Sequence, residues 1–195
     1  MKRLFDLISS LFVLIVLSPI LLIISLFIVL DSKGGVFYKQ ERIGKNGNPF
    51  LLYKFRSMRT GSDKKGLITV GASDNRTTSV GRFIRKYKLD ELPQLINIIK
   101  NDMSVVGPRP EVNKYVKLYS KVQLRVLVAK PGLTDLASLA YINENEVLRK
   151  AEDPEKTYIE EIMPAKLKLN LEYIEKQNIA FDLKIIFRTI VSIVS

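Results

Sequence analysis

The chain has 195 residues, with 31 Lys and Arg against 20 Asp and Glu and a formal net charge of +11. It contains no Cys and no His, which excludes disulfides, thiolate nucleophiles, imidazole bases and zinc or iron-sulfur sites. The length allows one domain with an appendage. Any catalytic group must therefore be oxygen-based or amine-based, and a carboxylate assisted by a hard metal ion such as Mg²⁺ is the first expectation. The positive charge indicates anionic partners: nucleic acid, phosphorylated small molecules or an acidic lipid surface.

The N-terminal segment is apolar and carries no charge over residues 7–30. As a straight helix it would be about 36 Å long, enough for a hydrocarbon core of about 30 Å. A cleaved secretory signal is one alternative, but the apolar run is long for a signal and no small-x-small cleavage site follows it. A single-pass anchor is another. Basic residues flank both ends, however, so the positive-inside bias favours entry and exit through the same leaflet.

Ser18 and Pro19 lie in the middle of this run. Proline lacks an N–H and its ring clashes with the preceding turn, so it frees carbonyl groups and bends a helix. The Ser18 hydroxyl can satisfy one freed carbonyl, which lowers the cost of a break in lipid. We therefore expect a re-entrant membrane helix-break-helix over residues 1–35, followed by a cytoplasmic domain over residues 36–195.

The second part is expected to be a helix-rich α+β domain. β-branched and aromatic runs at 36–38 and 50–55, separated by a Gly- and Asn-rich turn, predict a β-hairpin. Residues 59–77 are polar and Gly-rich and predict a long loop. Residues 181–194 predict either a core helix or an amphipathic helix at the membrane interface. Other helices are expected from the cap at 77–79 to Lys88, from Pro93 to Lys100, over 115–128 and over 165–177.

Two adjacent carboxylates, Asp90 and Glu91, precede Pro93. They are therefore expected at the junction of two helices, near the positive end of the second. An acidic pair at a helix start is usually a cap. The neighbouring cations give it a second interpretation, because Arg82, Arg85 and Lys86 share one face of the preceding helix.

Arg109 lies between Pro108 and Pro110. Each proline fixes its own φ angle and restricts the residue before it, so the guanidinium is held on a stiff turn. Such a group is suited to bidentate binding of phosphate. Paired carboxylates, cations and a rigid arginine turn within one short region together indicate a site for a phosphorylated ligand.

These residues resemble the bacterial sugar transferases, specifically the small, minimal form of the monotopic polyprenol-phosphate phosphoglycosyl transferases. The resemblance spans most of the chain and includes the Ser18-Pro19 break. The matching motifs are Arg42-x-Gly44-x-x-Gly47, Tyr53-Lys54-Phe55-Arg56-Ser57-Met58, Thr78-x-x-Gly81-x-x-Ile84-Arg85, Leu89-Asp90-Glu91-Leu92-Pro93-Gln94-Leu95, Met103-Ser104-Val105-Val106-Gly107-Pro108-Arg109-Pro110 and Lys130-Pro131-Gly132-Leu133-Thr134.

The resemblance implies transfer of a sugar-1-phosphate from a UDP-sugar, expected to be N-acetylated, to undecaprenyl phosphate with release of UMP. This would be the first membrane step in making a surface polysaccharide (exopolysaccharide, capsule or O-antigen) or a glycoconjugate, at the cytoplasmic face of the bacterial inner membrane. Asp90 would attack the β-phosphate to form a phosphosugar-aspartyl enzyme, Glu91 would help to activate the acceptor, and Mg²⁺ would bind at Asp90. The groups implied to hold phosphates are Lys54, Arg56, Arg85 and Arg109. An ionised Asp needs no base, which fits a chain without His.

Three places depart from the usual pattern of that family. Gly35 stands where many members have Pro before the first strand. Asn101 stands where Gly is common, and Asn tolerates a left-handed backbone. Residues 135–138 stand where many members carry Gly-Trp, which leaves the identity of the sugar open. A membrane-tethered nucleic-acid-binding protein is the competing interpretation, but no nucleic-acid motif is present, so no nucleic-acid partner is expected. An inactive scaffold relative is a further alternative, and the oligomeric state cannot be inferred from the sequence.

Overall fold

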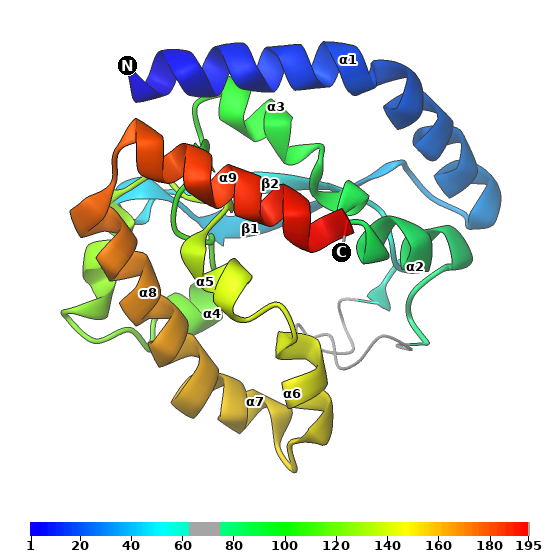
Figure 1. Ribbon diagram of the computed structural model, residues 1–195. Coiled ribbons are helices and arrows are strands. Elements are labelled where there is room, and N and C mark those ends of the chain that lie inside the picture. The colour runs from blue at the N-terminus through cyan, green and yellow to red at the C-terminus, as the bar shows by residue number, and fades with distance from the viewer. Residues whose placement is uncertain (63–74, 195) are drawn as a thin grey trace.

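The N-terminal apolar segment forms one long helix, α1 (Lys2–Asp31), in the computed structural model, which describes residues 1–62 and 75–194. Figure 1 shows α1 changing direction about midway along its length, so the helix bends where the sequence predicted a break. The Ser18 hydroxyl donates a hydrogen bond of 2.8 Å to the carbonyl of Ile15. This carbonyl is the one that Pro19 leaves without an N–H donor, so the expected role of Ser18 is confirmed.

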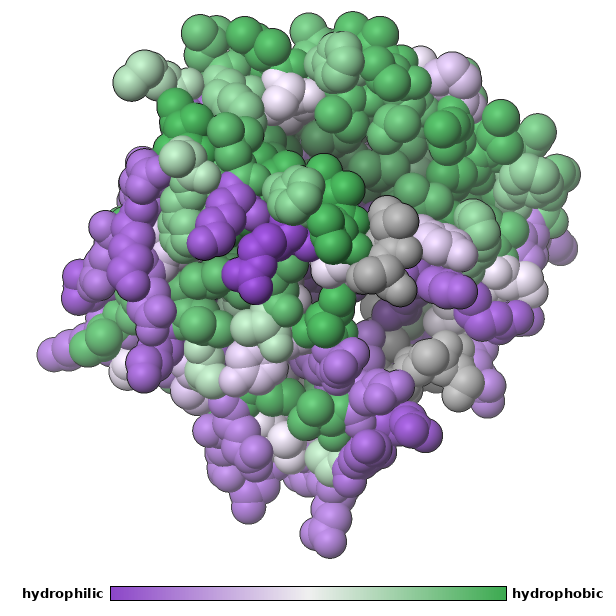
Figure 2. Space-filling model, in the orientation of Figure 1, coloured by the Kyte–Doolittle hydropathy of each residue, from purple (hydrophilic) through white to green (hydrophobic). Residues whose placement is uncertain are grey.

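α1 is long and apolar enough to cross a membrane. Many of its large apolar side chains are exposed, among them Phe12, Ile15 and Leu22. Figure 2 shows hydrophobic residues gathered over the part of the molecule where α1 lies, and hydrophilic residues at the opposite end near α6 (Glu144–Lys150) and α7 (Pro154–Thr157). An apolar surface of this extent marks a contact with lipid or with another protein.

Both ends of α1 are attached to the rest of the chain by polar contacts. Near the N-terminal end, the buried Asp6 carboxylate accepts hydrogen bonds from Ser104 Oγ at 2.8 Å and from the Val105 backbone N–H at 3.0 Å. Lys2 pairs with the buried carboxylate of Asp182, in α9 (Ile179–Val194). At the other end, Asp31 accepts a hydrogen bond of 2.8 Å from the backbone N–H of Val80.

α9 is helical, as predicted, and its two faces differ. Asp182 and Ile185 are buried against the protein, whereas Leu183, Phe187 and Ile190 are exposed. The helix therefore contributes to the core and also leaves an apolar face uncovered. In Figure 1 this helix lies below α1, across the front of the molecule.

The predicted hairpin is confirmed: β1 (Phe37–Ile43) and β2 (Pro49–Phe55) form an antiparallel pair. A short 3₁₀ turn, η1 (Lys45–Gly47), connects the two strands. The buried Asn97 side chain attaches the other edge of β2 to α3 (Gln94–Ile99). Its Oδ1 accepts from the Tyr53 N–H at 3.0 Å, and its Nδ2 donates to the Leu51 carbonyl at 2.7 Å. This edge is thereby satisfied without a third strand, which fixes the direction of Lys54.

A second, parallel pair was not expected from the sequence. It joins β3 (Ser104–Val106) to β4 (Gly132–Thr134). The two backbones come so close that a Cβ on Gly132 would lie 2.1 Å from the Gly107 nitrogen, so only glycine fits there. This contact holds the chain immediately before Pro108.

The helix predicted over residues 115–128 is wrong. The structure has α4 (Asn113–Val116) and a separate 3₁₀ segment, η4 (Gln123–Val128). Ser120 and Gln123 explain the interruption, because each side chain bonds the backbone N–H of the other, at 3.3 and 2.8 Å. This is a capping box, which begins a new helical segment instead of continuing the old one.

The remaining helices agree with the expected positions where a prediction was made. α2 (Ser79–Lys86) and α8 (Met163–Lys176) occupy the predicted segments, while α5 (Leu136–Ala140), α6, α7 and the π-helical turn η5 (Tyr158–Ile162) were not predicted. The predicted loop at 59–77 falls largely on residues 63–74, outside the described residues. With its many helices and two small sheets, the chain has the expected helix-rich α+β fold.

Candidate active site

The two adjacent carboxylates lie where the sequence placed them, at a junction of two helices. Thr78 caps α2 by accepting a hydrogen bond of 3.0 Å from the Gly81 N–H. After α2, Lys88 adopts the left-handed conformation with φ 55°, and the chain makes one 3₁₀ turn, η3 (Leu89–Glu91), before α3 begins. A lysine in this backbone region is uncommon, and such positions cluster at functional sites.

Glu91 is held by two cations from distant parts of the chain. Its Oε1 accepts from Lys54 Nζ and from Arg109 Nη2, both at 2.9 Å. Burial alone would raise the pKa of Glu91, but the charges of Arg109 and Lys54 outweigh it and hold the pKa well below its usual range. Glu91 therefore remains ionised and joins β2, η3 and the arginine turn.

Asp90 is in a different environment. Its side chain is buried, yet its carboxylate accepts no hydrogen bond from any described residue. Burial raises the pKa of Asp90, against the opposing charges of Lys54, Arg85 and Lys88. An oxygen nucleophile with a raised pKa and no hydrogen-bond partner is more reactive than a paired one.

The pKa values of the two cations that hold Glu91 are shifted in opposite directions. Glu91 raises the pKa of Arg109, whose charge is therefore permanent. Burial lowers the pKa of Lys54, and the charge of Glu91 opposes this effect. Arg85, on α2, is half-buried and its charge acts on Asp90. The structure thus brings together Lys54, Arg85, Asp90, Glu91 and Arg109, all predicted from the sequence.

The structure places Arg56 elsewhere. Its buried guanidinium donates from Nη2 to the carbonyls of Ile28 at 3.1 Å and Ser32 at 2.6 Å, so it caps the C-terminal end of α1. Nε and Nη1 are buried with no hydrogen-bond partner in the described part of the chain. A phosphate-binding role for Arg56 remains a prediction.

The arginine turn, residues 108–110, is held in place by the neighbouring parallel strand pair, β3 and β4. The Gly107 N–H donates to the Thr134 carbonyl at 3.1 Å, and the Gly132 N–H donates to the Pro108 carbonyl at 2.9 Å. Pro108 and Pro110 are both buried, as expected for residues that position the turn. The Arg109 side chain itself remains about one-third exposed, so a ligand can reach it.

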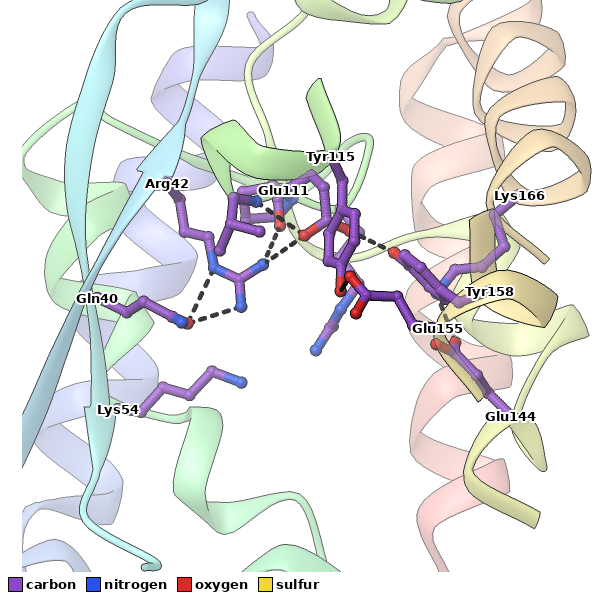
Figure 3. Close-up of polar contacts among 12 residues, drawn as sticks. Gln40, Arg42, Lys54, Glu111, Tyr115, Glu144, Glu155, Tyr158 and Lys166 are labelled. Atoms are coloured by element: carbon purple, nitrogen blue, oxygen red, sulfur yellow. Dashed lines mark hydrogen bonds and ion pairs between the residues drawn. The ribbon is translucent and has the colours of Figure 1, made fainter. Parts of the chain in front are cut away.

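A second polar network lies next to the turn and was missed by sequence reasoning. Figure 3 shows Gln40 and Arg42 on the strand side of Glu111, with Tyr158 on the opposite side. Arg42 pairs with Glu111 at 3.0 Å, and the Tyr158 hydroxyl also donates to Glu111. The only sequence signal is Glu111 directly after Pro110, because Tyr158 is 47 residues further along the chain.

The site contains one accessible kind of metal ligand, the carboxylate oxygen. Among the described residues, no group of three Asp or Glu side chains is close enough to form a metal cage. Mg²⁺ is usually bound through one or two carboxylates together with substrate phosphates and water. The Asp90 carboxylate, without hydrogen bonds, fits that pattern.

The fold and the site define a class of protein: a helix-rich α+β chain whose cation-rich site, built around two carboxylates, is attached to a long apolar helix. A family model described as bacterial sugar transferase matches residues 1–195. The chain belongs to this family.

Relatives named for different functions share most of the chain. It is 39% identical over 201 residues to "Exopolysaccharide production protein PSS" of Rhizobium leguminosarum bv. phaseoli, covering 98% of this chain and 94% of that protein. It is 39% identical over 190 residues to "Uncharacterized sugar transferase EpsL" of Bacillus subtilis (strain 168), covering 97% and 85%.

A third relative is the "UDP-glucose:undecaprenyl-phosphate glucose-1-phosphate transferase" of Escherichia coli (strain K12). The identity is 36% over 195 residues, which cover 97% of this chain but only 39% of that protein. The chain therefore corresponds to about two fifths of the length of this relative.

Proposed function

We propose that the chain is a phosphoglycosyl transferase that moves a sugar-1-phosphate from a UDP-sugar to undecaprenyl phosphate and releases UMP. The observation that carries the proposal is the contrast between Asp90, buried without a hydrogen bond from the described residues, and Glu91 beside it, whose Oε1 pairs with Lys54 and Arg109. A transfer of this kind needs one free anionic nucleophile surrounded by cations that hold phosphates. The name of the Escherichia coli relative supplies the substrate classes, a UDP-sugar and undecaprenyl phosphate.

The proposed reaction has two steps. An Asp90 carboxylate oxygen attacks the β-phosphorus, the bridging P–O bond to the α-phosphate breaks, and UMP leaves with the bridging oxygen. A phosphate oxygen of the lipid then attacks the same phosphorus, and the aspartyl O–P bond breaks to regenerate Asp90. Arg85 and Arg109 hold phosphate oxygens during both steps.

Glu91 acts in this scheme through the cations that it holds. Because its pKa lies well below the usual range, Glu91 is a weak proton acceptor. Its contribution to acceptor activation is therefore to fix Lys54 and Arg109 where the charge of the lipid phosphate must be neutralised.

Mg²⁺ is proposed as the cofactor, held by Asp90 and by diphosphate oxygens of the donor. When bound, it would neutralise negative charge on the transferring phosphate and the leaving group. Arg85 and Arg109 of the chain orient the donor. Omitting divalent cations or adding EDTA should abolish UMP release, and Mn²⁺ should restore part of it. Undiminished activity in EDTA would exclude this cofactor.

The membrane arrangement is also proposed. We place α1 in the inner membrane as a re-entrant helix, with α9 in the interface and the site at the cytoplasmic face. The bend and the basic residues at both ends of α1 support this arrangement. A Cys introduced at position 2 should be labelled from the cytoplasm, whereas labelling only from the periplasm would exclude re-entry. Pro19→Leu should straighten α1 and favour a span.

The decisive experiment is a UMP-release assay with undecaprenyl phosphate and a panel of UDP-sugars. The panel should contain N-acetylated sugars, our first expectation, together with glucose and galactose. Turnover with one of them, with ping-pong kinetics, supports the proposal. A protein that releases no UMP from any donor would indicate an inactive scaffold, and salt-sensitive binding of DNA in its place would indicate a nucleic-acid-binding protein.

A further inference from the structure

The network around Glu111 connects three parts of the chain that are far apart in sequence. Arg42 on β1 donates from Nη1 to Glu111 Oε1 at 3.0 Å and to the Pro110 carbonyl at 3.1 Å. Its other nitrogens, Nε and Nη2, donate to Gln40 Oε1 at 3.1 and 2.7 Å. The guanidinium of Arg42 is thus engaged by protein acceptors on every nitrogen.

Glu111 receives hydrogen bonds on both carboxylate oxygens. Oε1 accepts from Arg42 and from the Val112 N–H at 2.8 Å, and Oε2 accepts from the Tyr158 hydroxyl. The Glu111 backbone carbonyl also accepts from the Ile43 N–H at 2.9 Å, which binds it to the end of β1. Figure 3 shows Glu111 between the hairpin on one side and Tyr158 on the other.

Tyr158 reaches this position through an unusual piece of helix. It is the first residue of the π-helical turn η5, and its ring packs in the core cluster that contains Val112, Tyr115 and Ile162. π-Helical turns are rare and often occur at functional sites, because the extra residue changes which side chains face a neighbouring element. Here the turn allows Tyr158 to pack in the core and direct its hydroxyl at Glu111.

We infer that Glu111 is a positioning residue for the arginine turn, and that Tyr158 holds Glu111 in place. The inference rests on the proposed function for its kinetic consequence. Glu111 holds Arg42, and Arg42 donates to the Pro110 carbonyl. Pro110 fixes Arg109, and Arg109 pairs with Glu91 at 2.9 Å. The segment around η5 thereby acts on a phosphate-binding arginine without touching the substrate.

The test compares two tyrosines in the same cluster. Tyr158 and Tyr115 are both buried, their ring centroids lie 5.0 Å apart, and the hydroxyl of each contacts a glutamate. The hydroxyl of Tyr115 contacts Glu155, on α7, and not a residue of the arginine turn. Tyr115→Phe is therefore a matched control for the loss of one buried hydroxyl.

Tyr158→Phe should lower kcat about tenfold, with little change in the KM for the UDP-sugar, and Tyr115→Phe should stay within about twofold of the parent. Thermal unfolding of both variants controls for a general loss of stability. In an Arg109→Lys background the Tyr158→Phe change should have almost no further effect, since its action passes through the guanidinium. Equal kcat values for the two tyrosine variants, or the same tenfold loss in the Arg109→Lys background, would overturn the inference.

Hydrogen exchange gives a result that does not depend on activity. The backbone amides of Arg109, Glu111 and Val112 should exchange faster in Tyr158→Phe than in Tyr115→Phe. Unchanged exchange at all three amides would overturn the positioning role. If the parent itself released no UMP, the proposed function would fail, while this comparison would still decide whether Tyr158 holds the turn.

Discussion

The two adjacent carboxylates of the site differ in whether their charge is paired. Around Glu91 the charges are paired: one carboxylate oxygen joins Lys54 and Arg109 at 2.9 Å each. Around Asp90, one residue earlier, the carboxylate is buried and the cations act on it without a hydrogen bond from the described residues. Adjacent residues on a 3₁₀ turn such as η3 point about 120° apart, which allows such different surroundings.

This difference assigns a structural role to Glu91 and a chemical role to Asp90. A buried carboxylate that is paired with cations stabilises the fold and costs free energy when its charge is removed. A buried carboxylate without such bonds destabilises the fold and is available to react. The two residues should therefore respond to the same conservative substitution with different changes in stability: removing the charge of Glu91 should destabilise the protein, whereas removing that of Asp90 should not.

The largest expected effect is on activity at Asp90. Asp90→Asn keeps the shape but removes the attacking charge, so we expect a rate loss of at least about a thousandfold, roughly 4 kcal/mol of barrier. Its stability should be unchanged or higher, because a buried charge has been removed. UMP release, intact-protein mass spectrometry and chemical denaturation test this. A phosphosugar adduct on the variant would contradict the assignment.

Glu91→Gln should mainly destabilise the protein. It leaves Lys54 and Arg109 without their shared anion, and we expect a loss of about 3 kcal/mol in the free energy of unfolding. Turnover should also fall, but some labelled enzyme should accumulate from UDP-sugar without lipid acceptor, because the nucleophile is intact. A denaturation midpoint equal to that of the parent would show that the paired region does not stabilise the fold.

Asp6→Asn extends the comparison to a paired carboxylate outside the site. Asp6 accepts from Ser104 Oγ and the Val105 N–H, and an amide can replace only part of these charge-assisted bonds. We expect a loss of about 1.5 kcal/mol in stability, with kcat close to that of the parent. Denaturation and UMP release measured on the same preparation separate the two quantities. A thousandfold loss of kcat without a loss of stability would assign Asp6 to the chemistry.

Lowering the pH should remove activity before it removes stability. The pKa of Asp90 is raised above 3.8, so acidification first protonates this nucleophile and should reduce the rate about tenfold per pH unit below that pKa. Neutral Asp90 favours the folded state, and this contribution is lost as the pH rises through its folded pKa. Glu91 behaves in the opposite way: its stabilisation is present above pH 4.5 and is lost as the pH falls through its lower folded pKa. Simultaneous loss of rate and thermal stability would contradict this order.

Local signals in the sequence predicted much of this molecule. The apolar run, the hairpin with its Gly- and Asn-rich turn, the Thr78 cap and the positions of Asp90 and Glu91 all depend on residues close together in the chain. Asn101 also has the left-handed backbone expected of it, with φ 75°. Such features follow from backbone preferences and side-chain periodicity.

Long-range pairings could not be predicted in the same way. The parallel pairing of β3 with β4 depends on the close approach of Gly107 and Gly132, and nothing near either glycine specifies the other. The Tyr158 contact with Glu111 depends on a π-helical turn, which has no sequence signal that we could use. Arg56 illustrates the same limit, because its motif does not reveal that its guanidinium caps α1.

The pairing of Lys2 with Asp182 has a consequence for the time course of synthesis. The partners are 180 residues apart, and at about 5–20 residues per second Asp182 leaves the ribosome on the order of ten to forty seconds after Lys2. During that interval α1 can enter lipid while its basic end has no carboxylate from α9. If α1 lies in the membrane as proposed, it can insert before the fold is complete, and α9 then fixes the end of a helix that has already been placed.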